Sequence, residues 1–460
     1  MAISHNAESS ISRQRRIITW KEVSSHNTRD SCYIVINGLV YDVTEWLSKH
    51  PGGELVILNM CGVDCTDVFN AYHSTEIRDK MLSPYHIGHV KDYKVKPVTD
   101  AFRAFARSVE KSDLMTVEYK FYLKLFIWYA SLLLSAVYCV LAFPGSWWMS
   151  AALGGLLMGA FLQQVAFVGH DLGHSSVFHR RQMDSNVGLF CGNMLSGVSI
   201  GWWKATHNTH HVITNSTVAD PDIQHLPVFA VSSKFFQGIY STYHERIMKF
   251  GRLARFLVPW QSRLYYFAMA IARVNLYIQS YRFLFSGNKF SERRIRTHFW
   301  PELLGLIFFA VWFGALMSQI SNTSWKLCFF AISHGFAGIL HVQITLSHFS
   351  MAMYHEKHPL DVDSFLEHQL NTCLDIDCYE WLDWFHGGLQ FQVAHHLFPR
   401  VPRSNLRRLR YITMAFCASQ SLTYKCVDFF SANRLLIEHL STVGEECRAS
   451  IVSDMLNLRG

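Results

Sequence analysis

Histidines gather in three short clusters of this chain, and each cluster lies beside a long apolar segment. The clusters read HDLGH, HNTHH and QVAHH, and we call them the first, second and third box. Their candidate ligands are His170 and His174, then His207, His210 and His211, then Gln392, His395 and His396. Imidazole is a good ligand for iron, copper and zinc. Seven histidines that converge beside a membrane would form a redox metal centre, which is the chemistry of an oxygen-using membrane enzyme.

The spacing within each box predicts a helix that presents its ligands on one face. Candidate ligands stand three or four residues apart in all three boxes, the separation that brings side chains together on a helix. A single histidine is more simply explained as an ordinary core or interfacial residue, but that explanation does not extend to three boxes of the same design. Gln392 stands where the spacing suggests another histidine. Its amide can offer a carbonyl oxygen or hold a ligating water.

Further polar residues lie close enough to the boxes to assist them. His348, at the end of the last apolar segment, is a candidate extra ligand, although an interfacial histidine explains it equally well. His341 lies two turns earlier and is the weaker candidate. Asp171 is expected to accept the second ring N–H of a ligating histidine. For Asp220 and Asp222, this role and simple turn capping both remain open.

A second pair of histidines, nearer the N-terminus, predicts a different metal chemistry. His50 begins the segment HPGGE, and His73 follows in AYHS. Glycines after a histidine allow the backbone to approach a large planar ligand. Two histidines from separate helix ends can occupy both axial positions of a haem iron, which favours electron transfer over oxygen chemistry. From spacing alone, a turn histidine with an unrelated surface histidine is an equally good explanation.

The composition predicts an integral membrane protein. Half of the 460 residues are hydrophobic, and only 17% are charged, against about 25% in soluble domains. The net charge of +7 comes without a dense basic run with interleaved stacking residues, which argues against nucleic-acid binding. The eleven cysteines are scattered and form no CxxC pair, so we expect reduced thiols. The polar N-terminus has no apolar core of a signal peptide.

Four apolar segments are long enough to cross a bilayer, which takes about 20 helical residues. These segments are 121–143, 147–168, 301–320 and 325–347. Residues 256–285 are also apolar, but Arg263, Arg273 and Arg282 interrupt them. Because an arginine at the bilayer centre costs about 2.5 kcal/mol or more, we expect a helix that lies in the interface. The segment WWK before the second box (residues 202–204) is expected to be a membrane-surface anchor whose lysine could contact a headgroup.

Four spans place all three boxes on one side of the membrane. Two hairpins leave the N-terminal region, the 169–300 loop and the 348–460 tail on the same side, and a fifth span would separate the third box from the others. The 169–300 loop is rich in lysine and arginine, which predicts a cytosolic location for this side.

The same patterns divide the chain into domains. Residues 1–17 are expected to be disordered, and 18–93 form a small α+β domain with a hairpin turn at Asn37-Gly38. Residues 94–120 are expected to form a linker with a charged amphipathic helix. An all-α membrane domain is predicted over 121–440, with four transmembrane helices and interfacial helices, followed by a tail at 441–460.

The small domain resembles cytochrome b5 over about residues 18–93, on the strength of HPGGE within its strand pattern. The resemblance implies that His50 and His73 ligate haem b. Other residues fit the family's pattern after the first haem ligand, namely Gly52, Gly53, Asp64, Thr66 and Phe69.

From about residue 18 to about 440, the chain resembles the membrane front-end desaturases with a fused cytochrome b5 domain. The motifs that carry the resemblance are HPGGE, HDLGH, WWKATHNTHH, DPDIQHLPVFAVS and GLQFQVAHHLFPRVPR. The glutamine that opens the third box marks the front-end group. DPDIQHLPVFAVSSKFF and QFQVAHHLFPRVPRSNLR are most similar to sphingolipid Δ8-desaturases, and acyl-lipid Δ6- and Δ5-desaturases share most of the pattern. Ala394 departs from the family, since many members have glutamate there, and the lost carboxylate could alter regioselectivity or rate.

This resemblance implies two non-haem irons held by the seven box histidines and His348, with Gln392 nearby. It implies that O2 and haem-derived electrons introduce a double bond into a ceramide, long-chain base or acyl chain. Because the chain has no GxGxxG-type nucleotide site, the electrons would come from NADH-cytochrome b5 reductase. The expected location is the endoplasmic reticulum membrane. The alternatives are a Δ6/Δ5 acyl-lipid desaturase, a lipid hydroxylase with the same centre, and a membrane electron carrier that uses only its haem domain.

Overall fold

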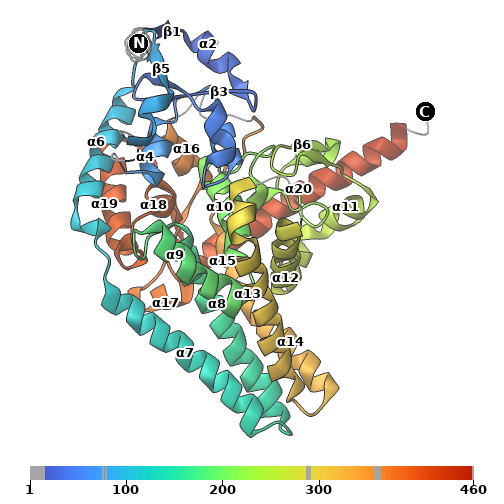
Figure 1. The fold of residues 1–460 in the computed structure, drawn as a ribbon. Coiled ribbons are helices and arrows are strands. Elements are labelled where there is room, and N and C mark those ends of the chain that lie inside the picture. The colour runs from blue at the N-terminus through green and yellow to red at the C-terminus, as the bar shows by residue number, and fades with distance from the viewer. Residues whose placement is uncertain (1–15, 75–76, 78–79, 286–291, 357–363, 458–460) are drawn as a thin grey trace.

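A computed structural model describes residues 16–74, 77, 80–285, 292–356 and 364–457. The N-terminal part is a small domain at the top of Figure 1. Its elements are β1 (Ile17–Ile18), α2 (Trp20–Ser25), β2 (Asn27–Thr28), β3 (Ser31–Ile36), β4 (Leu39–Asp42), η1 (Thr44–Lys49), α3 (Glu54–Leu58), α4 (Thr66–Tyr72), η2 (Ser83–Tyr85) and β5 (His86–Val90). The predicted disorder at 1–17 falls almost wholly outside the described residues, but Ile17 already belongs to β1.

The small domain is built on a five-stranded sheet of order β1-β5-β4-β3-β2. Strands β3 and β4 form an antiparallel hairpin in which Ile36 pairs with Leu39. Asn37 and Gly38 both have positive φ, at 51° and 76°, as the tight hairpin turn requires. The predicted turn is therefore confirmed. The sheet supports the helices whose ends present His50 and His73.

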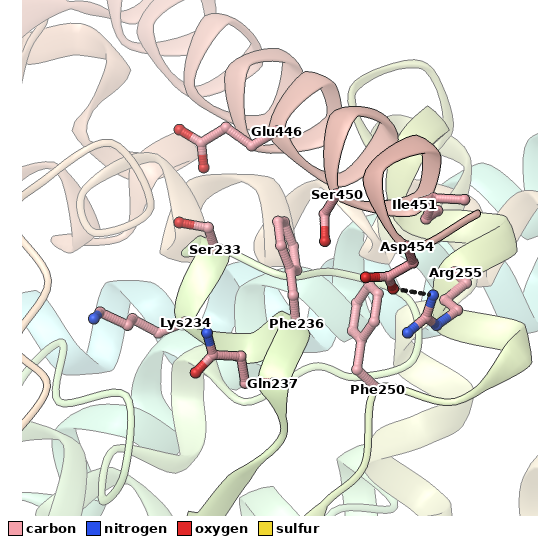
Figure 2. A pocket seen from close by; sticks show the side chains of 10 residues that line it. All are labelled: Ser233, Lys234, Phe236, Gln237, Phe250, Arg255, Glu446, Ser450, Ile451 and Asp454. Atoms are coloured by element: carbon pink, nitrogen blue, oxygen red, sulfur yellow. Dashed lines mark hydrogen bonds and ion pairs between the residues drawn. The ribbon is translucent and has the colours of Figure 1, made fainter. Parts of the chain in front are cut away.

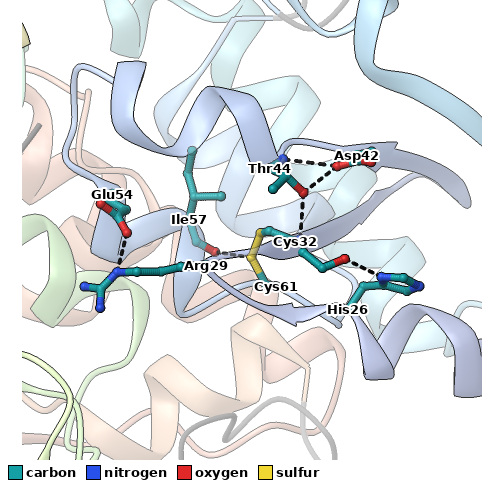
Figure 3. The surroundings of a disulfide bond; sticks show 9 residues. His26, Arg29, Cys32, Asp42, Thr44, Glu54, Ile57 and Cys61 are labelled. Atoms are coloured by element: carbon teal, nitrogen blue, oxygen red, sulfur yellow. Dashed lines mark hydrogen bonds and ion pairs between the residues drawn. A yellow bond between two sulfur atoms is a disulfide. The ribbon is translucent and has the colours of Figure 1, made fainter.

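One cysteine pair departs from the expectation of reduced thiols. Cys32 on β3 and Cys61, just beyond α3, form a disulfide, with Cα atoms 5.3 Å apart (Figure 3). This separation is within the range that a disulfide spans. The expectation was wrong at this pair because 29 residues separate the two cysteines and only the tertiary fold brings them together. The other nine cysteines are free.

The linker forms the expected helix and fastens the small domain to the rest of the molecule. Helix α6 (Pro97–Lys111) is followed by a short turn, η3 (Asp113–Met115). Arg103 of α6 is buried and donates to Asp67 of α4, with 2.7 Å between Nε and Oδ1. Phe102 and Val109 join a hydrophobic cluster that also contains Val68 of the small domain and Phe365 from the C-terminal half. The small domain and the membrane domain therefore share a core.

The membrane domain contains four helices that are long and apolar enough to cross a bilayer, and they match the predicted spans. The spans cover Asp113–Ala142, Trp147–Gly173, His298–Ser318 and Thr323–Leu346. They correspond to α7 (Tyr119–Ala142), a π-helical segment η4 (Trp147–Leu153) that runs into α8 (Gly154–Gly173), α13 (Glu292–Ser318), and α14 (Thr323–Ala337) followed by α15 (Ile339–Leu346). In Figure 1 these helices extend away from the small domain as two hairpins.

The remaining elements gather at the end of the spans that faces the small domain. Between α8 and α13 lie α9 (Arg181–Gly188), η5 (Leu189–Leu195), α10 (Ile200–Val212), η6 (Pro221–Ile223), η7 (Ser233–Gln237), β6 (Ile239–Ser241), β7 (Arg246–Met248), α11 (Arg252–Leu257), η8 (Val258–Trp260) and α12 (Gln261–Phe285). After α15 come α16 (Phe365–Thr372), β8 (Asp375–Asp377), η10 (Glu380–Leu382), α17 (Asp383–His386), η11 (Leu389–Phe391), α18 (Gln392–Leu397), η12 (Arg403–Asn405), α19 (Leu406–Ser419), β9 (Cys426–Asp428) and α20 (Phe429–Asn457).

The membrane domain differs from its predicted form in two respects, its short strands and its C-terminal boundary. It is mostly helical rather than all-α, because β6 pairs with β7 and β8 pairs with β9. The predicted boundary between 440 and 441 falls inside α20, where Val443 and Cys447 are buried. Helix α12, expected in the interface, packs against α14, α15 and α20. Its Arg273 is fully buried and donates to the carbonyl and hydroxyl of Ser196, which offsets part of the cost of an arginine among apolar residues.

Glycine allows the second and fourth spans to pack closely. A Cβ atom on Gly159 of α8 would lie 2.6 Å from the backbone oxygen of Ser333 and 2.7 Å from Cβ of Phe336. We therefore predict that Gly159→Ala destabilises the protein by about 1–3 kcal/mol through overpacking, measured as a lower melting temperature in detergent. Gly335→Ala on α14 is the matched control, because its Cβ would meet nothing within 4 Å. Equal melting temperatures for both variants would contradict this account.

Candidate metal centre and haem pocket

The two histidines that are candidate haem ligands face each other across a narrow gap. His50 ends η1 and His73 ends α4, and their ring centroids lie 6.1 Å apart. Each ring donates its Nδ1–H to a backbone carbonyl, that of Gly53 at 2.8 Å and that of Phe69 at 3.1 Å. Both Nε2 atoms therefore keep a lone pair for a metal. Burial lowers the pKa of His50, and it lowers the pKa of His73 to about 4. Two neutral imidazoles in this arrangement fit the axial positions of haem iron.

The glycines after His50 shape this pocket. A Cβ on Gly52 would lie 2.7 Å from Cε1 of the His50 ring, so a larger residue would displace the imidazole. Gly53 has φ of 101° where α3 begins, a conformation that glycine adopts readily. These two glycines allow the backbone to turn beneath the ring and to place the Gly53 carbonyl against Nδ1.

The three boxes converge although they come from separate parts of the chain. The first box ends α8, the second lies on α10, and the third lies on α18. Their histidines and His348 form two groups whose donor atoms lie within 4.8 Å of one another. One group has five histidines, namely His170, His174, His207, His211 and His395, and the other has His210, His348 and His396. All seven predicted box histidines are therefore brought together, and His348 joins them.

In the group of three histidines, each ring is oriented by a hydrogen bond from Nδ1. Asp220 accepts from His210 at 2.8 Å, the carbonyl of Thr372 accepts from His348 at 3.2 Å, and Oε1 of Gln369 accepts from His396 at 2.9 Å. The three Nε2 atoms then carry the lone pairs, as metal binding requires. The three residues could therefore hold a metal ion without a change of tautomer.

In the group of five histidines, the ring nitrogens face one another directly. Nε2 of His207 lies 3.2 Å from Nε2 of His170 and 3.1 Å from Nε2 of His211. Neither ring nitrogen of His174 has a hydrogen-bond partner among the residues that the structure describes. Buried polar atoms without partners are rare in folded proteins. A bound metal ion would provide the missing interaction for His174 and would separate the crowded Nε2 atoms as shared ligands.

The environment keeps most of these imidazoles neutral. Burial lowers the pKa of His174 well below its usual value, and neighbouring histidines lower it further. The same causes act on His207, His211 and His396. His210 differs: burial lowers its pKa, but the charge and hydrogen bond of Asp220 and the charge of Asp222 together outweigh burial and raise it. A neutral imidazole is the form that binds metal, so burial prepares the site at neutral pH.

The three carboxylates beside the boxes make different contacts from one another. Asp171 was expected to orient a histidine, but it pairs with Arg403 at 3.0 Å and lies 3.7 Å from the His170 ring. Asp220, whose role was open, makes the close contact with His210. Asp222 lies 3.5 Å from Nδ1 of His207. The Asp171–Arg403 pair connects the first box to the segment that follows the third box.

Three predicted residues beside the boxes also have defined surroundings. Gln392 is buried, and its Oε1 has no partner in the described part of the chain, so the amide oxygen is available near the metal site. Ala394 is fully buried within an apolar cluster. His341 is half-buried and belongs to neither histidine group.

Sequence reasoning missed the residues that support the histidines from a distance. Gln369 of α16 carries no motif that could have identified it. Trp203 was expected at the membrane surface, but its ring packs against His207, His170 and His174, at centroid distances of 4.4, 5.3 and 5.5 Å. Its position four residues before His207 was a usable signal.

A surface cavity of about 590 Å³ lies apart from both metal sites, between η7, α11 and α20 (Figure 2). Lys234, Arg255 and Asp454 contribute to its lining, and Arg255 forms an ion pair with Asp454 at 2.9 Å. No box residue lines it in the described part of the chain. It is therefore not the metal centre.

The comparisons with known proteins agree with this arrangement. Residues 146–427 match the family described as Fatty acid desaturase, and residues 19–91 match the Cytochrome b5-like Heme/Steroid binding domain. The chain belongs to the fatty acid desaturase family. The predicted family and fold class are confirmed. The desaturase is an oxidoreductase that acts on lipid and carries a fused cytochrome b5 domain.

Several relatives align with this desaturase over nearly their whole length. A "Delta(8)-fatty-acid desaturase" of Helianthus annuus is 39% identical over 95% of this chain and 94% of the relative. An "Acyl-lipid (9-3)-desaturase" of Borago officinalis is 36% identical over 94% of this chain and 95% of the relative. A "Delta 8-(E)-sphingolipid desaturase" of Emericella nidulans is 32% identical over 91% of this chain and 93% of the relative.

The Asp220–His210 hydrogen bond provides a test of the group of three histidines as a metal site. In Asp220→Asn, an amide N–H can face Nδ1 of His210, which favours the tautomer with the proton on Nε2 and removes the ligating lone pair. We predict a loss of metal affinity of about 10- to 100-fold, measured by Fe²⁺ titration of the purified desaturase under nitrogen. Asp113→Asn is the control, because Asp113 is exposed and pairs with Arg408. Unchanged affinity in Asp220→Asn would refute this role.

Proposed function

We propose that this desaturase holds two non-haem irons in its histidine groups and uses haem-derived electrons and O2 to desaturate a long lipid chain. The observation that carries the proposal is the convergence of eight histidines, six buried and two half-buried, into groups of five and three. Their donors suit iron, because neutral imidazole is a preferred ligand of that metal. The group of five includes both histidines of the first box, and the group of three includes His348. Gln392 would lie beside the irons as a further oxygen donor or as the holder of a water.

The chemistry follows from the electron count. Iron in such a site supplies O2 activation. Forming a carbon–carbon double bond removes two hydrogens, with two electrons, from adjacent carbons. Reduction of O2 to two waters takes four electrons and four protons, so two more electrons and two more protons must come from elsewhere. The haem domain can deliver these electrons one at a time. The buried rings and Trp203 exclude bulk water from the donor atoms, and the hydrogen bonds of Asp220, Gln369 and Thr372 hold three histidines in the ligating tautomer.

We favour a sphingolipid substrate with the new bond at the Δ8 position. The names of relatives support this choice, since Δ8 desaturases of plants and a Δ8 sphingolipid desaturase of a fungus align with over nine-tenths of this chain. The runner-up is an acyl-lipid substrate, which the Borago relative named for acyl lipids supports. The substrate chain would be a ceramide or free long-chain base in the first case and a membrane acyl lipid in the second.

We also propose the partner and the location that this chemistry needs. The haem domain must be reduced by a second protein, and NADH-cytochrome b5 reductase provides one electron at a time to such a domain. A basic surface on the side of the boxes agrees with a cytosolic orientation. Lipid substrates of this class and the reductase point to the endoplasmic reticulum membrane.

Expression in yeast tests the proposed function. We expect new Δ8-unsaturated long-chain bases in the lipid extract, detected by mass spectrometry after derivatisation of the double bond. His210→Ala should abolish them, because it removes one of only three histidines in its group, whereas the exposed-site variant Asp113→Asn should not. New unsaturated fatty acids in their place would support the acyl-lipid alternative. Hydroxylated lipids in the extract would instead show a hydroxylase. If His207→Ala and His210→Ala both left the lipid profile of the yeast unchanged from that of the parent, the protein would be an electron carrier that uses only its haem domain.

A further inference from the structure

Tyr72 lies between the candidate haem pocket and the candidate metal centre, and it belongs to none of the three boxes. It is the last residue of α4, so a single peptide bond connects it to His73. Its ring lies on the other side, 6.3 Å from the ring of His211 and 6.4 Å from that of His174, measured between centroids. These separations are within the range of interacting aromatic rings. One residue thus adjoins a haem ligand through its backbone and two box histidines through its side chain.

The docking of the haem domain fixes Tyr72 in this position. Helix α3 packs against α10, which carries the second box. Arg29 of the haem domain forms ion pairs with Glu54, at 2.5 Å, and with Glu245 in the loop between β6 and β7. On the opposite side, Arg103 of α6 holds Asp67 on the same helix as Tyr72. The shared hydrophobic cluster, against which the Tyr72 ring packs, completes the interface.

The chemical surroundings of the Tyr72 ring favour a role other than hydrogen bonding. Its hydroxyl oxygen is buried and has no hydrogen-bond partner among the residues that the structure describes. A buried hydroxyl without a partner costs free energy, so hydrogen bonding does not account for the position of this side chain. The remaining contacts of the ring are with apolar residues and imidazoles. What this position provides is a polarisable ring between two metal sites.

We propose that Tyr72 is the positioning residue that couples the haem electronically to the iron centre within one chain. This inference rests on the proposed function and deepens it, since it names the route by which the haem electrons reach the irons. In each transfer, one electron leaves reduced haem, which becomes oxidised, and one ferric ion of the centre becomes ferrous. Tyr72 undergoes no net change, and no bond forms or breaks. Electron tunnelling declines steeply through empty space, so a filled aromatic contact speeds transfer.

The proposal is tested by removing the ring. The full-length desaturase, loaded with haem and iron, is given one electron equivalent under nitrogen in a stopped-flow instrument. Reoxidation of the haem by the ferric centre is followed by haem absorbance. We expect Tyr72→Leu, whose smaller side chain leaves part of this contact unfilled, to slow the internal transfer severalfold, whereas Tyr72→Phe keeps the ring and the parent rate. The haem midpoint potential should not change in either variant, because His50 and His73 and their hydrogen bonds remain.

Controls separate electronic coupling from damage to the fold. Tyr72→Met gives a second non-aromatic, flexible side chain in case leucine does not pack. Tyr85→Leu removes an aromatic ring that contacts Trp46 within the haem domain and should leave the transfer rate unchanged. A parent rate in both Tyr72→Leu and Tyr72→Met, with full haem and iron content, would overturn the proposal. Equal slowing in Tyr72→Phe would overturn it as well, because the hydroxyl and not the ring would then be responsible.

A bypass experiment keeps this test distinct from the proposed function. Excess dithionite reduces the iron centre directly, and subsequent O2 should yield the same amount of unsaturated product from Tyr72→Leu as from the parent if only the coupling was lost. Product loss that dithionite does not restore would show a damaged iron site and overturn the coupling role. Absence of product from the parent under dithionite would instead refute the proposed function, whatever the transfer rates are.

Discussion

The structure depends on one constraint, which is that many imidazoles must present lone pairs, not protons, to the same small volume. Water would protonate or compete with these rings, so they must be buried, and burial lowers the pKa of most of them. Burial alone leaves the tautomer undetermined. The second requirement is therefore an acceptor for each Nδ1–H, and Asp220, Gln369 and the Thr372 carbonyl meet it in the group of three histidines. The same principle applies to the haem pocket, where two backbone carbonyls accept from His50 and His73.

These acceptors explain why so much of the chain surrounds the boxes. Asp220 also accepts from the backbone N–H of Asn215, and Asn215 in turn donates to the carbonyls of His348 and Ala352. Gln369 donates to the carbonyl of His211 while it accepts from His396. Each supporting side chain thus connects two boxes or a box and the fourth span. The histidine positions are set by this network together with helix packing, which makes the site rigid before any metal binds.

The predictable part of the site was the part encoded by local spacing. Ligands three or four residues apart define a helix face, and lengths of apolar sequence define spans, so the boxes, the four spans and their shared side followed from the sequence. The contacts that could not be predicted join residues that lie far apart in the sequence. The acceptor Gln369 lies 27 residues before His396, and the Cys32–Cys61 pair is separated by 29 residues. Asp171 was expected to accept from a ligating histidine, and its pairing with Arg403, which lies far along the chain, could not be inferred from local spacing.

The firm docking of the haem domain has a consequence for how electrons arrive. A separate cytochrome must find its partner by collision, and a tethered one still searches a volume set by its linker. Here α6 is ordered and its Arg103 is buried against Asp67, and the haem domain shares a hydrophobic cluster with α16 and α18. The ordering entropy is therefore lost once, on folding, rather than at each electron transfer. Because the contact is fixed, the rate of electron transfer across it depends on the residues at the interface. Tyr72, the last residue of α4, is one of them. The contact of the Tyr72 ring with His174 and His211 thus follows from the same docking that makes the haem domain part of the enzyme's core.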